Sequence, residues 1–191
     1  MPTIEELRKT RIQKLEALKS GDKNPFPSSI KCDCDIRTIL ENYWFLRLLR
    51  KEFSLTGRIK SIRIHGQAAF FDLEDASGKI QCFLNPRDLS AKGGSASGGK
   101  NKTSYTDFIA NFDIGDFAEI KGIVFKAKQG EKTVRAREIK MVTKSLRPLP
   151  EKWHGLKDVE ERYRKRYLDL LMNKDVKNNF LVRSEIIKIE K

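Results

Sequence analysis

Apolar and polar residues alternate along residues 53–84, a pattern typical of β-strands that are buried on one face. The alternation that begins at Phe53 continues to Ile59 and then slips by one position at Ser61. A slip would turn every later side chain to the wrong face, so we expect a β-bulge near Ser61. A long first strand that is bent by a glycine and a bulge is typical of a small closed barrel.

Two turn sequences, His65-Gly66 and residues 75–78, divide this stretch into three strands. The alternation places Arg63, Phe70 and Gln81 on the outer faces of these adjacent strands. An exposed phenyl ring beside a guanidinium and an amide can stack on an unpaired base and form hydrogen bonds with its edge. The alternative, more common for a single aromatic residue, is that Phe70 lies under a neighbouring helix. The presence of all three side chains favours the base-binding interpretation.

The rest of the barrel follows from the same kind of pattern. Residues 103–112 have helical spacing, residues 116–126 and 133–142 are strand-like, and residues 128–131 form the turn between these two strands. Three strands, a helix and two strands are the order of an OB-fold. We therefore predict an all-β OB-fold barrel of five strands, with one helix between strands 3 and 4.

Helices are expected before the barrel. Thr3 and Glu6 have the spacing of a capping box, and Gly21 is expected to end the first helix in a left-handed conformation. A second helix is expected from residue 35 to about residue 51. Its apolar side predicts that it closes one end of the barrel or leads into the first strand.

A C-terminal α-helical segment is expected after the barrel. A proline-rich linker at residues 146–150 precedes two helical patterns, one from Asp158 to about Leu171 and one that begins at Asp175. The expected organisation therefore has three parts, namely an N-terminal basic helical extension (1–52), the barrel domain (53–145) and a helical segment (146–191).

The net charge of the chain indicates which kind of ligand the predicted barrel binds. The 191 residues include 39 Lys and Arg against 26 Asp and Glu, which gives a formal net charge of +13. Such an excess attracts polyanions, and nucleic acid is the first candidate. No long apolar run or signal-like N-terminus is present, so no membrane association is expected. The odd number of cysteines, three, favours free thiols in a reducing compartment and therefore a cytoplasmic protein.

Two apparent ligand motifs are rejected. Residues 91–102 form a Gly/Ser-rich insertion that is expected to be mobile. Gly94, Gly99 and Lys100 satisfy part of the P-loop pattern, but Asn101 stands where Ser or Thr would ligate magnesium. The Cys32-Asp33-Cys34 sequence lacks a second Cys or His pair at zinc-ligand spacing, so no metal site is predicted.

Basic side chains are candidates for contacts with a phosphate backbone. The polar face of the first predicted helix carries Arg8, Lys9, Arg11, Lys14 and Lys19. The ordinary interpretation is a solvated face, and an RNA contact is favoured only if the adjoining barrel binds RNA. We assign supporting RNA contacts to seven residues: Arg8, Arg11, Lys14, Arg58, His65, Arg135 and Arg137.

The sequence RPLPEKWHGLKDVEERYRKRYLDLL, residues 147–171, resembles the linker and the start of the catalytic domain of bacterial class II lysyl-tRNA synthetases. Residues 57–81, and the N-terminal stretch up to Asn24-Pro25-Phe26-Pro27, resemble the same family. The resemblance covers nearly the whole chain except the insertion. Aspartyl and asparaginyl synthetases share the OB-fold and the outward-facing trio, whereas the motif of residues 154–170 favours lysine.

The resemblance implies an anticodon-binding domain whose partner is tRNA(Lys). It implies that Phe70 stacks on the central uridine, that Arg63 and Gln81 form hydrogen bonds with it, and that Glu131 reads a neighbouring anticodon base. The helix from Asp175 resembles that of class II motif 1, which implies a homodimer for the full-length enzyme. Motifs 2 and 3 are absent, so ATP and Mg²⁺ are implied for the full-length enzyme only, with no catalytic residue and no cofactor in this chain.

Two further interpretations stay open. One is a freestanding OB-fold module that binds RNA without aminoacylation, and the other is an inactive paralogue that acts through RNA binding alone. The first is disfavoured because the last predicted helix would leave its apolar residues uncovered in a complete small module.

Overall fold

The computed structural model describes residues 3–21, 24–90, 103–127, 130–149 and 158–189. The chain divides into two compact units, residues 1–148 and residues 149–191. The expected Gly/Ser-rich insertion, the P-loop look-alike and the middle of the linker motif lie outside the described residues.

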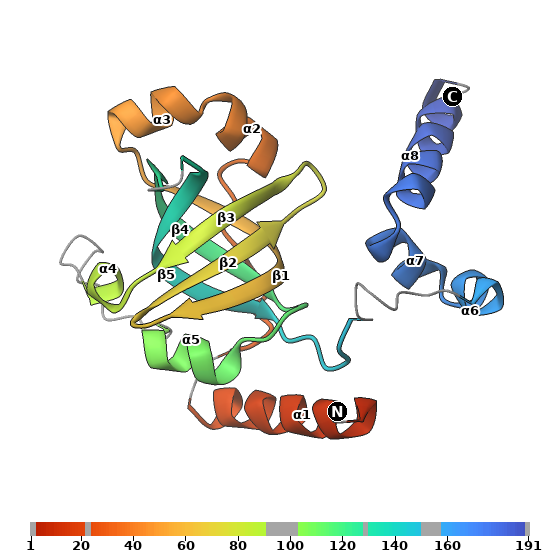
Figure 1. Ribbon diagram of the computed structural model, residues 1–191, viewed down its shortest axis with the longest axis horizontal. Coiled ribbons are helices and arrows are strands. Elements are labelled where there is room, and N and C mark those ends of the chain that lie inside the picture. Colours follow the sequence, from red (N-terminus) through yellow and green to blue (C-terminus); the bar gives the residue numbers. More distant parts are fainter. Residues whose placement is uncertain (1–2, 22–23, 91–102, 128–129, 150–157, 190–191) are drawn as a thin grey trace. The chain divides into compact units, whose positions relative to one another are not determined.

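The first unit is built around a closed barrel in which the strand order is β1-β2-β3-β5-β4 (Figure 1). All neighbouring pairs are antiparallel except β3 and β5, which run parallel and close the barrel. This topology, with a helix between β3 and β4, confirms the predicted OB-fold. The strands are β1 (Phe53–His65), β2 (Ala68–Glu74), β3 (Lys79–Leu84), β4 (Phe117–Lys126) and β5 (Lys132–Thr143).

The bend in β1 lies where the sequence predicts it. Ile59 is opposite Leu73 and Ser61 is opposite Asp72, so one extra residue of β1 lies between these pairs and forms the bulge. Gly57 permits close approach of the neighbouring strand, because a Cβ atom there would lie 2.8 Å from the backbone oxygen of Glu74. The strand thereby pairs with β4 along its first half and with β2 along its second half.

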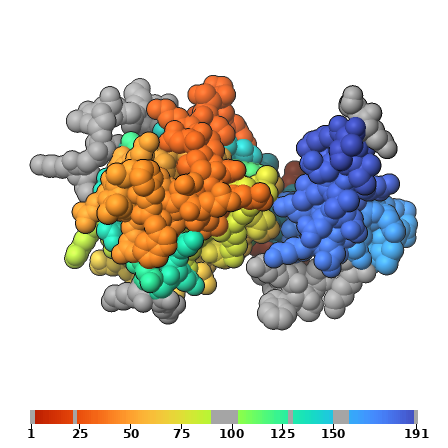
Figure 2. All heavy atoms as spheres, turned by 90° about the horizontal axis from the view of Figure 1, so that it is seen from above, coloured from red at the N-terminus to blue at the C-terminus, as the bar shows by residue number. Residues whose placement is uncertain are grey.

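One end of the barrel is covered by α2 (Ile36–Glu41) and α3 (Tyr43–Leu49) (Figures 1 and 2). Ile36, Ile39 and Tyr43 belong to the same buried cluster as the barrel interior, which confirms that this segment closes the barrel. The prediction of a single helix over residues 35–51 is wrong, since Asn42 separates two short helices. Packing of α2 against β3 and of α3 against β4 gives each helix its own direction.

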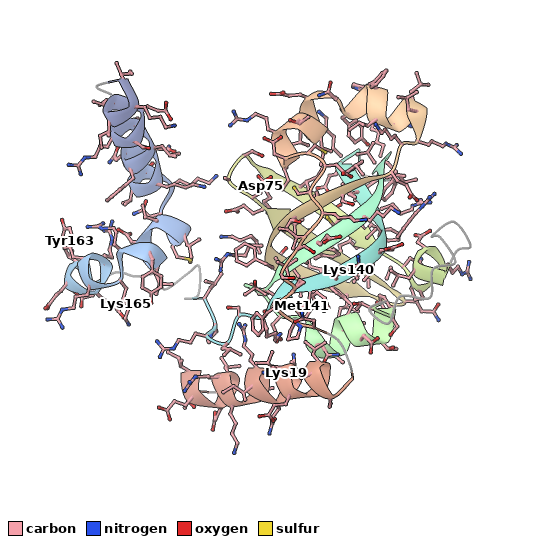
Figure 3. All side chains as sticks on the ribbon, turned by 180° about the vertical axis from the view of Figure 1, so that it is seen from behind. Lys19, Asp75, Lys140, Met141, Tyr163 and Lys165 are labelled. Carbon is pink, nitrogen blue, oxygen red and sulfur yellow. The ribbon has the colours of Figure 1, made fainter. Side chains whose placement is uncertain are left out.

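A half-buried aspartate fixes the start of α2. Asp75, in the turn between β2 and β3, accepts hydrogen bonds from the backbone N–H groups of Ile36, Ser77 and Gly78 at 2.7–2.9 Å (Figure 3). Burial would raise the pKa of Asp75, but these hydrogen bonds outweigh it and lower the pKa. The β2–β3 turn therefore also caps the helix that closes the barrel.

The other end of the barrel is closed by α5 (Tyr105–Asn111), whose Phe108 ring lies 5.2 Å from that of Phe71. A short helix that the sequence pattern did not predict, α4 (Pro86–Ser90), follows β3. The N-terminal helix α1 (Ile4–Ser20) contacts α5 and buries Leu15 and Leu18 (Figure 1).

The two ends of α1 give different outcomes. The capping box of Thr3 and Glu6 is confirmed, with the reciprocal hydrogen bonds at 3.2 and 2.8 Å. Gly21 is the C-terminal cap, but its φ of −79° is not left-handed, so that part of the prediction is wrong. The N–H of Gly21 instead reaches the carbonyl oxygen of Ala17 in an ordinary last turn.

The second unit consists of α6 (Val159–Arg164), α7 (Arg166–Met172) and α8 (Lys174–Ile189). The prediction of one helix from Asp158 to Leu171 is wrong, because Lys165 separates α6 from α7. Asp169, which is 2% exposed, accepts from Arg162 at 3.0 Å and from Arg166 at 2.7 Å. The contact with Arg162 joins α6 to α7 across the break, whereas the contact with Arg166 lies within α7.

Candidate nucleic-acid interface

The outer surface of the barrel carries a pocket of 670 Å³ that all five strands or their connections line. Arg63 is opposite Phe70 across β1 and β2, and Phe70 is opposite Phe83 across β2 and β3. The three side chains that the sequence places on the outer faces, Arg63, Phe70 and Gln81, all line this pocket. Its lining residues are Arg63, His65, Phe70, Gln81, Phe83, Phe125, Lys126, Ala127, Glu131 and Arg135.

A row of aromatic rings crosses this pocket. The ring of Phe70 lies 5.0 Å from that of Phe83, which in turn lies 5.7 Å from that of Phe125. The imidazole of His65 lies 6.2 Å from Phe70 at the other end of the row. None of the three phenylalanines is fully buried, so part of each ring is open to flat ligands such as nucleic-acid bases.

Arg63 is oriented by an anion on the neighbouring strand. Its Nη2 atom lies 3.7 Å from the carboxylate of Asp72, which also accepts from Lys79 at 2.8 Å and from Ser61 at 2.6 Å. Burial would raise the pKa of Asp72, but the hydrogen bonds and the nearby cations outweigh burial and lower it. The Arg63 side chain stays 53% exposed, so it is positioned and still open to a ligand.

The side chain of Gln81 is held by a residue of β5. Its Oε1 atom accepts a hydrogen bond of 3.0 Å from the hydroxyl of Thr133 on β5, the strand that lies parallel to β3. An amide held through its oxygen presents its NH₂ group as the remaining polar edge.

Arg135 and Glu131 bring opposite charges to the far end of the ring row. The guanidinium carbon of Arg135 lies 4.7 Å from the centroid of Phe125, and its Nε atom lies 3.8 Å from the carboxylate of Asp88. Glu131 is exposed beside the β4–β5 turn, where its backbone oxygen accepts from Ala127. The pocket thus combines stacking surfaces with a cation and an anion, which suits recognition of base edges.

Two predicted barrel contacts do not line the pocket. The guanidinium carbon of Arg58 lies 4.4 Å from the centroid of Phe117, and burial lowers the pKa of Arg58. Arg137 forms an ion pair with Glu52. Both side chains therefore serve contacts within the protein.

The prediction that the basic side chains of α1 are all exposed is wrong for Arg11, and Lys14 is partly engaged in an ion pair. Arg11 is only 9% exposed and donates to the backbone oxygens of Ser145 at 2.9 Å and Ile114 at 3.0 Å. Lys14 forms an ion pair of 2.6 Å with Asp113. Arg8 and Lys9 remain exposed. Lys19, near the C-terminal end of the same helix, is exposed as well (Figure 3).

Four residues in or beside the pocket were not predicted from the sequence: Phe83, Phe125, Lys126 and Thr133. Phe83 shares the outer face of β3 with Gln81, and Phe125 alternates with the inward-facing Val124, so strand alternation alone contained a signal for both rings. Thr133 had no such signal, because its contact with Gln81 depends on the pairing of β3 with β5.

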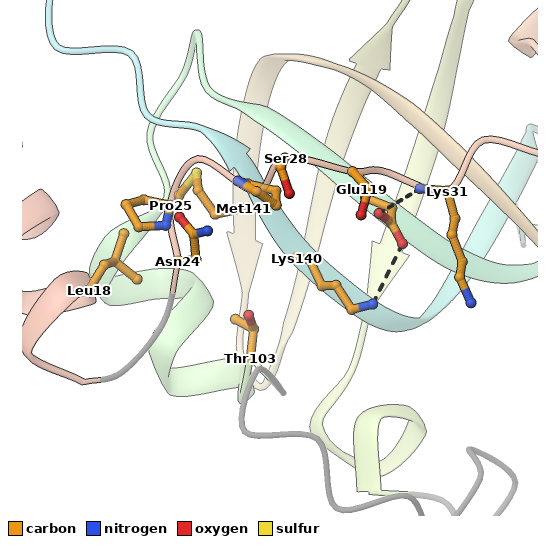
Figure 4. Close-up of a pocket in the computed structure, with 11 residues that line it drawn as sticks. Leu18, Asn24, Pro25, Ser28, Lys31, Thr103, Glu119, Lys140 and Met141 are labelled. Atoms are coloured by element: carbon orange, nitrogen blue, oxygen red, sulfur yellow. Dashed lines mark hydrogen bonds and ion pairs between the residues drawn. The ribbon is translucent and has the colours of Figure 1, made fainter.

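A second hollow, of 290 Å³, lies where residues 24–31 cross β4 and β5 (Figure 4). Its buried carboxylate, Glu119, accepts from the backbone N–H of Lys31 at 3.0 Å and lies 3.7 Å from Nζ of Lys140 (Figure 4). These contacts fasten the N-terminal connector to the barrel, and the lining contains no aromatic ring.

The geometry agrees with a comparison against known families. The tRNA anticodon-binding family, described as an OB-fold nucleic acid binding domain, matches residues 53–142. In the structure these residues form the closed five-stranded barrel, which is consistent with an OB-fold. The matched range includes every residue that lines the barrel pocket.

Relatives extend the comparison to the whole chain. It is 42% identical to the lysine–tRNA ligase of Clostridium botulinum over 184 residues, which are 96% of this chain and 34% of that ligase. For the lysine–tRNA ligase of Syntrophomonas wolfei the identity is 43% over 185 residues, 97% of this chain and 35% of the relative. The chain thus corresponds to the N-terminal part of these ligases and spans about a third of their length.

In the part of the chain that the structure describes, no helix is long and apolar enough to cross a membrane. Within the same residues, no three His, Cys, Asp or Glu side chains gather as a metal would require.

Proposed function

We propose that this chain is the tRNA-binding part of a lysine–tRNA ligase and that the barrel pocket binds the anticodon of tRNA(Lys). The observation that supports the proposal most directly is the row of three partly exposed phenylalanine rings bordered by Arg63, Gln81 and Glu131. Single-stranded bases stack on such rings, and polar side chains at the border read their edges. The identity of the chain to lysine–tRNA ligases over nearly its whole length adds the substrate.

In this proposal each reading residue has its own role. Phe70 stacks on the central uridine, while Arg63 and Gln81 form hydrogen bonds with its edge. Glu131 accepts hydrogen bonds from a neighbouring anticodon base, with Arg135 and Phe125 beside it. Arg8 and Lys9, which are exposed on α1, contribute attraction to the phosphate backbone.

The deciding experiment measures binding of anticodon stem-loops that differ only at the central base. The 191-residue chain is expected to bind a loop with a central U more tightly than one with a central C. Gln81→Ala is expected to reduce that preference, because the amide reads the base edge rather than its face. Equal binding of all loops by the folded parent chain and by the variant would refute the proposed site.

We propose that the amino-acid activation step, with ATP and Mg²⁺ and a class II catalytic domain, belongs to the part of the ligase outside this chain. The described residues do not fit such a site, since they include no cluster of carboxylates that would hold a metal. Lysine-dependent exchange of pyrophosphate into ATP is therefore expected to stay at background with the 191-residue chain. Exchange that survives repurification would contradict this division.

We propose further that the complete ligase is a homodimer and that α8 lies in its interface. Apolar side chains of α8 are exposed within the second unit, among them Phe180, Ile186 and Ile187. An apolar surface of this kind is costly in water and suits contact with another protein surface. Ile187→Asp in the complete ligase is expected to shift its sedimentation from dimer to monomer, and an unchanged dimer would count against this interface.

A further inference from the structure

Thr133 is completely buried and contacts Gln81, although it does not line the pocket. The two residues are opposite each other where β3 and β5 close the barrel. The hydroxyl oxygen of Thr133 lies 3.0 Å from Oε1 of Gln81 and 3.2 Å from the backbone oxygen of Glu131. A threonine hydroxyl has a single proton to donate, so these two oxygens compete for it.

A backbone hydrogen bond beside the β4–β5 turn favours Oε1 of Gln81 as the acceptor of the Thr133 proton. The carbonyl oxygen of Glu131 already accepts a hydrogen bond of 3.0 Å from the N–H of Ala127. Oε1 of Gln81 has no other donor among the residues that the structure describes. A buried hydroxyl needs a partner, and the Gln81 oxygen is the acceptor that is still unsatisfied.

This hydrogen bond gives the Gln81 amide a defined polarity. With Oε1 directed to Thr133, the Nε2 group is the polar edge left for the pocket, and it has no acceptor among the residues that the structure describes. The reversed amide would place a carbonyl oxygen there instead and would invite donors. The two orientations therefore favour different bases.

We propose that Thr133 is a positioning residue that fixes Gln81 as a hydrogen-bond donor and thereby makes the pocket prefer uracil to cytosine. Uracil has a carbonyl oxygen at ring position 4, where cytosine has an amino group, so only uracil accepts from the amide at that position. This inference rests on the proposed anticodon site and adds the residue that determines its polarity.

Packing alone does not account for the hydroxyl. Valine has nearly the shape of threonine, favours strands as strongly and leaves no polar group to satisfy in a fully buried position. The hydroxyl of Thr133 instead has a partner that faces the pocket. Thr133→Val therefore removes the hydrogen bond while the strand retains a side chain that suits it.

The test compares Thr133→Val with Thr133→Ser, which keeps the hydroxyl. The measured quantity is the ratio of dissociation constants for stem-loops with a central C and a central U. Thr133→Val is expected to lower this ratio roughly tenfold, which is the discrimination that one good edge contact supplies. Thr133→Ser is expected to keep the parent ratio, and thermal unfolding of each variant checks that it is folded.

The outcomes separate the two proposals. If Gln81→Ala lowers the ratio and folded Thr133→Val does not, the role of Thr133 is refuted and the anticodon site stands. If Gln81→Ala leaves the ratio unchanged, both proposals fail. If Thr133→Val does not fold, the test uses the parent chain and a loop whose central base is 4-thiouracil, in which sulfur, a weak acceptor, replaces O4 and the N3–H group is kept. Weaker binding of that loop than of the U loop supports the donor orientation, and equal binding refutes it.

Discussion

The barrel pocket and the inner side of α1 both contain basic side chains, but they use them differently. In the pocket, the guanidinium of Arg63 lies 3.7 Å from the carboxylate of Asp72, and its side chain remains 53% exposed. On α1, Arg11 is 9% exposed and donates to backbone oxygens of three residues. Partnered, buried cations hold a protein together, whereas exposed cations remain available to a polyanion.

The contacts of α1 also form a connected network. Lys144 has a fully buried side chain and lies 2.5 Å from Asp113 and 2.7 Å from Asp116. Asp113 in turn pairs with Lys14 of α1. Substitutions in the α1 network are therefore expected to change the stability of the fold, and substitutions in the pocket are expected to change RNA binding.

Arg11→Met is expected to have the largest effect. It leaves backbone oxygens at the end of the barrel without a donor and should lower the free energy of unfolding by ~2–4 kcal/mol. Urea denaturation measures this loss, with Arg8→Met on the exposed side of the same helix as the matched control. A loss no greater than that of the control would show that α1 is not fastened through Arg11.

Phe70→Ala tests the role of the barrel pocket in RNA binding. Loss of one base–aromatic stack should weaken binding of a U-centred stem-loop by ~1–3 kcal/mol. Fluorescence anisotropy measures the change, and Phe45→Ala, an exposed ring on α3 outside the pocket, is the control. Similar losses in both variants would mean that binding is not centred on the pocket.

Asp113→Asn tests the charge network through its pH dependence. Burial would raise the pKa of Asp113, but Lys14 and Lys144 outweigh it and lower the pKa in the folded protein. The ionised carboxylate therefore stabilises the fold above the ordinary aspartate pKa of about 3.9, and this stabilisation is lost as the pH falls below that value. The parent chain should be more stable than the variant by ~1 kcal/mol at pH 7.

That difference in unfolding free energy should shrink as the pH falls from 5 to 3. Urea denaturation at each pH measures it. A difference that stays constant over this range would show that the variant acts through packing rather than through the charge of Asp113.

The smallest effect is expected from the exposed side of α1. The double variant Arg8→Gln with Lys9→Gln should lower the slope of log affinity against log salt by about one to two, because each lost phosphate contact contributes about one. The preference for a central U should not change. An unaltered slope would remove α1 from the RNA interface and confine binding to the barrel.

Alternation and turn chemistry alone determined much of the fold. The long β1, its bulge near Ser61 and the outward positions of Phe70 and Gln81 follow from the two-residue period of strands, which tertiary contacts rarely override when one face is buried. The capping box at Thr3 is equally local. The resemblance of residues 147–171 to a known family indicated the substrate proposed above, which no pattern of polar and apolar residues could have indicated.

Tertiary structure decided which polar groups face a ligand and which face each other. The sequence placed Arg11 with Arg8 on a basic face, but three backbone oxygens from distant residues attract only Arg11 inward. Thr133 meets Gln81 because the barrel closes by pairing β3 with β5, 52 residues apart in the sequence. Such contacts depend on which strands pair across the closure, and the periodicity of a single strand carries no information about its distant partner.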